Sequence, residues 1–173
     1  MPKLKFVVFA LLLGLILICG VGRATAGDLA KPQGKIILTV SGAISNVNGP
    51  HEATFDMALL KTLPKSKITT KTIWTDGTST YEGVRLKDLL AAVGATGKNL
   101  HAIALNDYAV DVPVSDATAG GPILAYSVDG ADLPVRSRGP LWLIYPFDDD
   151  AKYRTEVIYT RSIWQLNRID VKD

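Results

Sequence analysis

Cysteine is almost absent from this chain of 173 residues. Its one cysteine, Cys19, lies within an apolar run near the N-terminus. If that run is removed, the rest of the chain has no disulfide, no thiolate metal ligand and no cysteine nucleophile. An apolar core must then hold it together. A chain of this length buries about two-thirds of its unfolded surface on folding, which is enough for one domain.

Histidine is also scarce, with only His51 and His101. His101 lies in an apolar segment, as a core histidine would, and His51 lies in a turn-rich segment and is expected to be exposed. The chain has no G-x-S-x-G motif, so nucleophilic hydrolysis is not indicated. The three consecutive acids Asp148–Asp150 do not have the alternate spacing of a calcium loop, and a solvated acidic loop is the better interpretation.

The N-terminus resembles an export signal. Two lysines precede an apolar run from Phe6 to Val21, and Ala24-Thr25-Ala26 is a small-residue cleavage motif. We therefore expect a secretory signal peptide at residues 1–26 and a single periplasmic domain at residues 27–173, not embedded in a membrane after cleavage. A retained membrane anchor is the alternative, although the apolar run is short for one.

Basic residues barely exceed acidic ones, and cleavage reverses the balance. The whole chain has 19 basic and 17 acidic residues, a net charge of +2. Residues 1–26 contain Lys3, Lys5 and Arg23 and no acid, so the mature chain has 16 basic and 17 acidic residues, a net charge of −1. This composition gives no reason to expect nucleic-acid binding.

The hydrophobic pattern predicts a β-rich chain with two helices. Amphipathic spacing predicts a short helix over 55–63, and a second helix that carries Leu86, Leu89, Leu90 and Val93 on one face and ends at Gly94. Strands are expected over 35–44, 67–75, 100–105, 108–114, 123–128, 141–145 and 163–171, with a short β-like segment at 157–159. The run 141–145 reads as buried on both faces, and turns are expected at 75–78 and 129–130. Seven or eight strands without βαβ regularity predict a mixed α+β domain.

Aromatic and arginine residues gather near the predicted turns. Flat heteroaromatic ligands bind to this combination of aromatic faces, a carboxylate for N–H donors and a guanidinium for carbonyls. The candidate ligand-binding residues are Trp74, Asp107, Tyr108, Arg136, Arg138, Trp142 and Trp164. For any single residue an ordinary core or surface role is at least as well supported, but the grouping favours a pocket.

Four segments, in this order, resemble motifs of the sulfite-oxidase-like, molybdopterin-binding oxidoreductase domains. They are W-T-D-G-T-S-T-Y-E-G-V-R-L-K-D-L-L at 74–90, N-D-Y-A-V-D-V-P at 106–113, the stretch 124–146 with D-G, L-P and G-P-L-W-L-I-Y-P, and S-I-W-Q-L-N-R-I-D-V at 162–171. The resemblance covers most of the expected mature chain. It implies a sulfite-oxidase-type α+β fold of mixed β-sheets with a few short helices.

The chain departs from that family at three functional positions. The molybdenum-ligating cysteine would fall within Ile68–Thr72, which contains none. The cofactor-contacting arginine of the family's G-P-x-R motif falls on Trp142, and the basic residue of the closing motif is replaced near Trp164. The chain thus resembles short exported relatives, periplasmic proteins that bind a metal-free pterin. Those relatives signal to the periplasmic segment of a membrane GGDEF/EAL-type protein that makes or degrades cyclic di-GMP.

The resemblance implies a pterin ligand, no catalytic or metal-binding residues, and no molybdenum cofactor. Trp74 and Trp142 would supply ring faces, Asp107 would accept from the N–H edge, and Arg138 or Arg136 would donate to the carbonyl. Two alternatives stay open: a molybdopterin-dependent oxidoreductase subunit, and an interaction domain whose pocket is filled by side chains.

Overall fold

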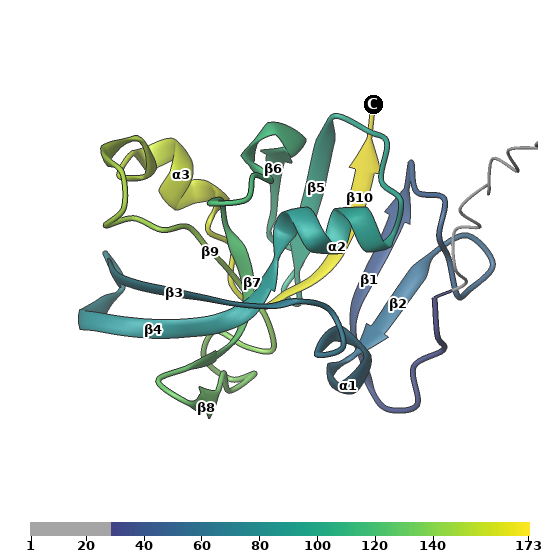
Figure 1. Ribbon diagram of the computed structural model, residues 1–173, viewed down its shortest axis with the longest axis horizontal. Coiled ribbons are helices and arrows are strands. Elements are labelled where there is room, and N and C mark those ends of the chain that lie inside the picture. Colours follow the sequence, from purple (N-terminus) through teal and green to yellow (C-terminus); the bar gives the residue numbers. More distant parts are fainter. Residues whose placement is uncertain (1–28) are drawn as a thin grey trace, which may run out of the picture.

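The computed structural model describes residues 29–173 (Figure 1). The expected signal peptide and its cleavage site therefore lie outside the described residues. None of the helices formed by residues 29–173 combines the length and hydrophobicity needed to span a bilayer.

The first of two sheets is mixed and contains the first and last strands of the chain. Its strands are β1 (Ile36–Gly42), β2 (Ala53–Asp56), β5 (Asn99–Ala104), β6 (Ala109–Pro113) and β10 (Leu166–Lys172). Their order is β2-β1-β10-β5-β6. The β1–β10 pair is parallel, with Val40 opposite Ile169, and the other pairs are antiparallel.

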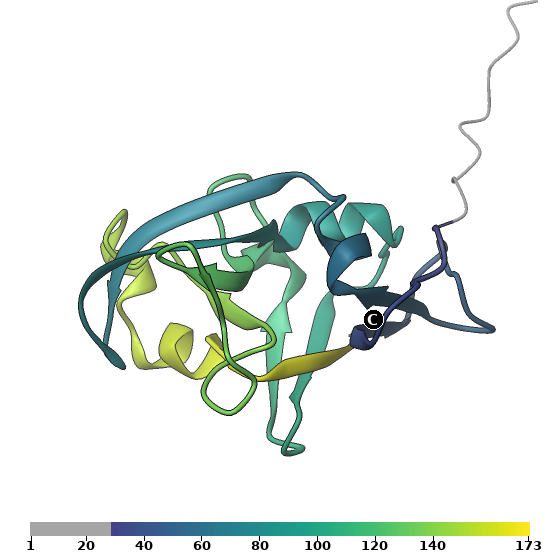
Figure 2. The same cartoon turned by 90° about the horizontal axis from the view of Figure 1, so that it is seen from below.

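The second sheet is built on a long hairpin. Its strands run in the order β3 (Lys65–Thr72), β4 (Thr75–Arg85), β7 (Ile123–Val128) and β8 (Ala131–Asp132), and β9 (Trp142–Ile144) also pairs with β7. Figure 2 shows the β3–β4 hairpin arching away from the first sheet until its tip approaches α3. Gly83 lets β4 pass close to β7, because a Cβ at this position would lie 2.1 Å from the Leu124 carbonyl oxygen.

Three short α-helices and two 3₁₀ turns connect the sheets. They are α1 (Met57–Leu60), α2 (Leu86–Ala92), α3 (Glu156–Arg161), η1 (Val114–Asp116) and η2 (Ala151–Tyr153). The α2 helix buries Leu86, Leu89 and Leu90 as its spacing predicts, and Gly94 follows it at a φ of +61°. One mixed and one antiparallel sheet, with few short helices, confirm the predicted α+β fold.

Three predicted elements are wrong. The expected turn at 75–78 belongs to β4, and the hairpin instead turns at Ile73–Trp74. The β-like segment 157–159 lies in α3, whose start is capped because the Thr155 hydroxyl accepts from the Ile158 amide at 3.3 Å. The helix expected over 55–63 is divided between β2 and the four-residue α1, because Asp56, the last residue of β2, caps the start of α1.

The core has two parts. The larger cluster lies between the sheets and α2, and the smaller surrounds Tyr81, Ile123 and Trp142. Trp74 packs against both. Every residue of the run 141–145 is buried, as its sequence predicts.

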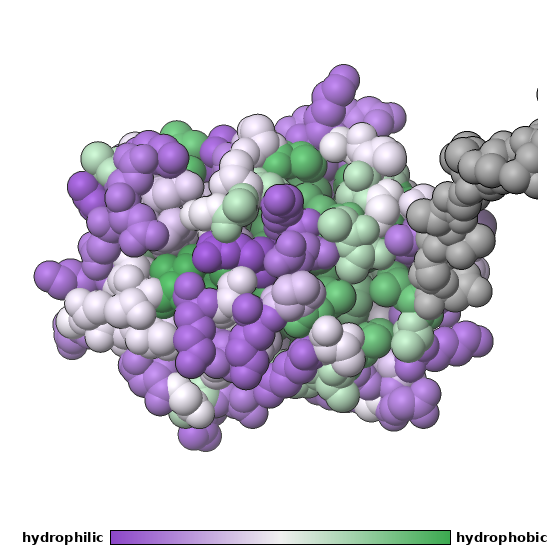
Figure 3. Space-filling model, in the orientation of Figure 1, coloured by the Kyte–Doolittle hydropathy of each residue, from purple (hydrophilic) through white to green (hydrophobic). Residues whose placement is uncertain are grey.

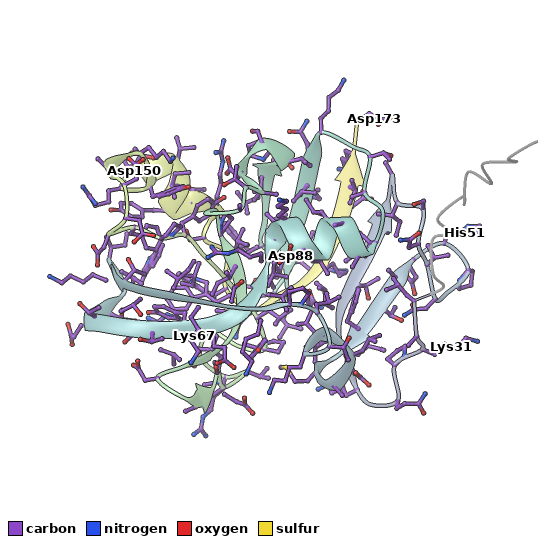
Figure 4. All side chains as sticks on the ribbon, viewed as in Figure 1. Lys31, His51, Lys67, Asp88, Asp150 and Asp173 are labelled. Carbon is purple, nitrogen blue, oxygen red and sulfur yellow. The ribbon has the colours of Figure 1, made fainter. Side chains whose placement is uncertain are left out.

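Both histidines lie outside the core. His51 is exposed, as predicted, and Figure 4 places it at the opposite end of the molecule from Asp150, which lies beside α3. The prediction of a core position for His101 is wrong. Its ring is half-buried on the first sheet, where Nδ1 lies 2.7 Å from the Asp111 carboxylate on the neighbouring strand β6.

Candidate functional site

A cavity of about 580 Å³ opens between the tip of the β3–β4 hairpin, the β5–β6 turn and α3 with the segment that follows it. Small-molecule sites typically have volumes of about 300–1,000 Å³. Its wall consists of Ile73, Trp74, Ala104, Asn106, Tyr108, Glu156, Tyr159, Thr160, Ser162, Ile163 and Trp164. Figure 3 shows hydrophobic side chains gathered between the hairpin and the region of α3, within a largely hydrophilic surface. The location and size of this cavity suit a small organic ligand.

Aromatic rings make up much of the wall. The Trp74 ring meets Trp164 and Tyr159 edge to face, with centroids 5.7 and 5.8 Å apart. Trp164 and Tyr108 are 38% and 51% exposed, respectively. Since the Trp74 and Trp164 planes lie at 81° to each other, these two rings cannot sandwich a flat molecule between parallel faces. A flat ligand would instead stack on one exposed ring and meet the edges of the others.

Arg138 and Trp142 lie beneath this wall and hold its parts together. An Arg138 Nη2 donates to the Trp74 carbonyl at 2.7 Å, and the guanidinium lies 5.0 Å from the centre of the Trp142 ring. Trp142 is 1% exposed, and its indole nitrogen donates to the Ser162 carbonyl at 2.9 Å. The expected ring face of Trp142 is therefore unavailable, because the side chain is enclosed in the core.

The structure does not bring all seven predicted residues together. Trp74, Tyr108 and Trp164 line the cavity. Asp107, at a φ of +63°, pairs with Arg168, and its side chain is 82% exposed and outside the wall. Arg136 is also exposed and outside the wall. The ligand contacts of these residues stay predictions.

Sequence reasoning missed much of the wall that α3 contributes. This helix contributes Glu156, Tyr159 and Thr160 to the wall, but its residues 157–159 were predicted to be β-like. A signal was present, since Thr155 followed by Glu156 has the character of a helix N-cap and first turn. Asn106, which lies between the strands expected over 100–105 and 108–114, was not among the candidate residues. Its side-chain oxygen accepts from the Tyr108 amide at 3.2 Å, which orients the carboxamide at the cavity.

A partly buried network fixes the C-terminal end of α3. The Asp116 carboxylate accepts from the Tyr145 hydroxyl at 2.7 Å and from Arg161 at 3.1 Å. Burial, reinforced by Asp116, raises the pKa of Tyr145, so that this hydroxyl remains a neutral donor. The network joins α3 to η1 and to Tyr145, the residue after β9, and thereby holds one side of the cavity in place.

The cavity wall has few charged side chains. Glu156 is its one ionisable acid, and no lysine, arginine or histidine is among the lining residues contributed by residues 29–173. In the same part of the chain, no group of three or more His, Cys, Asp or Glu residues is arranged to hold a metal ion. In the stretch where a thiolate would be expected, the inward-facing residues of β3 are Ile68 and Thr70. The Thr70 hydroxyl accepts from the Asp148 amide at 3.0 Å.

Comparison with models of known protein families identifies the family of this chain. The family described as the oxidoreductase molybdopterin binding domain matches residues 37–148. This range begins in β1, includes the β3–β4 hairpin and ends after β9, before α3. No curated protein matches the chain.

Proposed function

The chain belongs to the oxidoreductase molybdopterin-binding domain family, and from this premise we propose that it binds a metal-free pterin without catalysing a reaction. The aromatic cavity at the hairpin tip is the proposed site. The observation that carries the proposal is the character of its wall, in which exposed aromatic rings accompany one carboxylate and no cationic side chain from residues 29–173. A neutral, flat heterocycle with N–H donors matches such a wall in polarity and shape.

The residues around the cavity do not fit a molybdenum-bearing cofactor. Molybdopterin is anionic through its phosphate and binds its metal through sulfur, and in this family the protein would add a cysteine thiolate. The one cysteine of the chain, Cys19, lies outside the described residues and within the expected signal peptide. The wall contributed by residues 29–173 also has no cation to pair with a phosphate, and Glu156 would repel one. This mismatch supports a ligand that has neither metal nor phosphate.

We further propose that the protein acts in the periplasm and reports pterin availability to a membrane protein that makes or degrades cyclic di-GMP. The N-terminal sequence and the resemblance to periplasmic pterin-binding regulators support this role. Large apolar side chains near the cavity mouth are compatible with a protein partner: Ile73, Leu105, Tyr108 and Val157 are all exposed. In the source organism, deleting the gene should make cyclic di-GMP levels insensitive to pterin supply.

Titration of the mature protein with pterin and 7,8-dihydropterin, followed by tryptophan fluorescence and calorimetry, tests the binding step. We expect saturable binding at one site, and no stoichiometric molybdenum in protein isolated from a molybdenum-replete periplasm. Stoichiometric molybdenum would favour the oxidoreductase alternative. Failure to bind either pterin, in a folded protein without molybdenum, would favour an interaction domain and overturn the proposal.

A further inference from the structure

Glu156 stands apart from the other carboxylates near the cavity. It occupies the first position of α3 and lines the cavity, and its carboxylate has no partner among the ion pairs and hydrogen bonds of residues 29–173. The neighbouring acids are engaged elsewhere. Asp107 pairs with Arg168, Asp116 pairs with Tyr145 and Arg161, and Asp148 accepts from the Lys71 amide at 2.8 Å. Glu156 is therefore the carboxylate that a ligand in this cavity can engage without breaking an existing contact.

A purely structural role explains Glu156 less well. An acid in the first turn of a helix gains from the free amides there, but α3 has only six residues and the Thr155 hydroxyl already caps it. The anchors of α3 are the buried Ile158 and the partly buried Arg161–Asp116 pair, at other positions of the helix. Replacing Glu156 should therefore change the fold little, whereas its place in the wall puts an acceptor beside any bound molecule.

We infer that the Glu156 carboxylate recognises the 2-amino and N3–H donors of a pterin ring and thereby determines which heterocycles the cavity accepts, an inference that rests on the proposed pterin binding. The two donors lie side by side on one edge of the ring, as do the donors of a guanidinium. A carboxylate can accept both in parallel, and such charge-assisted pairs are both strong and directional. The role assigned by sequence to Asp107 thus passes to Glu156.

The rest of the wall complements this assignment. The exposed rings of Trp164 and Tyr108 offer faces for stacking. The Asn106 oxygen is occupied by the Tyr108 amide, which leaves its amide nitrogen to donate to a ring carbonyl or ring nitrogen. Glu156 lies outside the range 37–148 that matches the family. The selectivity that it provides is accordingly a property of the C-terminal wall of this chain.

Lumazine provides a sharp test, because it has the pterin bicycle with a 2-oxo group in place of the 2-amino group. The two molecules stack alike, but lumazine presents a carbonyl oxygen where pterin presents a donor, and a carboxylate repels that oxygen. We expect the wild-type protein to bind pterin about 10- to 100-fold more tightly than lumazine, since hydrogen bonds to a charged group are worth this much. In the Glu156→Gln variant the pterin affinity should fall and this preference should largely disappear.

Asp149→Asn is the matched control, because Asp149 is an exposed acid outside the wall. It should keep both the pterin affinity and the preference. Thermal unfolding of each variant shows whether the fold is intact, and the wild-type preference can be measured without any variant. Equal wild-type affinities for pterin and lumazine, or an unchanged preference in Glu156→Gln, would overturn the assignment while leaving pterin binding intact. Absence of binding to either molecule would instead overturn the proposed function.

Discussion

Trp74 is the residue at which the hairpin tip, the cavity wall and the core meet. It contacts Trp142, Tyr159, Trp164 and Phe147 through edge-to-face rings, and its carbonyl accepts from Arg138. Replacing Trp74 would therefore alter packing and cavity shape together. The other two tryptophans allow ligand binding and core packing to be tested separately. Trp164 is exposed in the wall, whereas Trp142 is enclosed beneath it.

Trp164→Ala should weaken pterin binding about 10- to 100-fold, by analogy with base–aromatic stacking, and should change the melting temperature little. Trp142→Ala should instead destabilise the fold by about 3–5 kcal/mol, because a large buried ring is lost. Calorimetric titration and thermal unfolding of both variants measure the two effects. A Trp164→Ala variant with a lowered melting temperature and a normal pterin affinity would show that Trp164 serves the core and not the binding site.

Asp56 links the start of the described chain to α1. Its carboxylate accepts from the amides of Leu59 at 2.7 Å, Gly34 at 2.6 Å and Gln33 at 2.7 Å. The Leu59 and Gly34 amides, in that order, are the main cause of a pKa for Asp56 below its usual value. A lowered folded-state pKa means that the stabilisation is complete above the unfolded-state pKa and is lost as the pH falls through the folded-state value.

The free energy of unfolding should therefore decrease as the pH falls below about 4, and part of this dependence should be absent from Asp56→Asn. Urea unfolding of both proteins between pH 6 and pH 3, values chosen to bracket about 4, measures it. Asp149→Asn provides the control, since Asp149 is exposed. Parallel pH profiles for the wild type and Asp56→Asn would contradict this account.

At the scale of elements, one guanidinium holds the backbone at the tip of the β3–β4 hairpin. Arg138, from the segment before β9, donates to the Trp74 carbonyl at the tip. The same guanidinium lies over the Trp142 ring. Arg136, two residues away, is exposed and makes no comparable contact in the described part of the chain. Substitutions of Arg136 and Arg138 can therefore be compared with each other.

Arg138→Ala should loosen the hairpin tip and cost about 1–3 kcal/mol, because a hydrogen bond to a charged donor is lost. Amide hydrogen exchange in peptides that span residues 70–76 should become faster, and pterin affinity should fall. Arg136→Ala should leave exchange and affinity at their wild-type values. If both variants behave alike, the guanidinium does not anchor the tip.

The α2 helix tests the apolar core. Leu89 is fully buried, so Leu89→Ala should destabilise the protein by about 2–5 kcal/mol. Lys87 is exposed on the same helix, and Lys87→Ala should fall within about 0.5 kcal/mol of the wild type. Denaturant midpoints compare the two substitutions, and similar midpoints for both variants would mean that this face of α2 is not part of the core.

The elements that were predicted well are those in which hydrophobic residues follow a clear pattern along the sequence. The α2 helix, with Leu86, Leu89 and Leu90 on its buried face, and the buried run 141–145 are both present. The hairpin tip was misplaced because Asp76-Gly77 is a strong turn signal, yet Gly77 adopts its φ of +69° within β4. The α3 helix was missed because only one of its six residues, Ile158, is buried, which leaves no helical period to detect.

At the scale of the whole molecule, the family and the α+β class followed from motifs and their order, but the composition of the site did not. The cavity joins a hairpin tip, a β5–β6 turn and α3, and these are distant in sequence. Sequence placed Trp142 and Asp107 in the site because of neighbouring turns. Packing then enclosed Trp142, and the left-handed backbone at Asp107 turned its carboxylate toward Arg168.

The expected export signal also determines the extent of the mature molecule. We expect cleavage after Ala26 and a mature chain that begins at Gly27 with a net charge of −1. Intact-mass measurement of the protein from a periplasmic extract determines the first residue directly. A mass that corresponds to the uncleaved chain, recovered with the membrane fraction, would favour the anchored alternative.

The chain contains three tryptophans, and all of them belong to the ring cluster around Trp74. With centroids 5.7, 5.7 and 6.3 Å apart, their electronic transitions couple to one another. All tryptophan emission of the protein therefore comes from the cavity wall and the core directly beneath it. An exciton couplet in far-ultraviolet circular dichroism, where the strongest indole band lies, should show that the three rings are packed together, and a pterin seated on Trp164 should quench the emission by energy transfer.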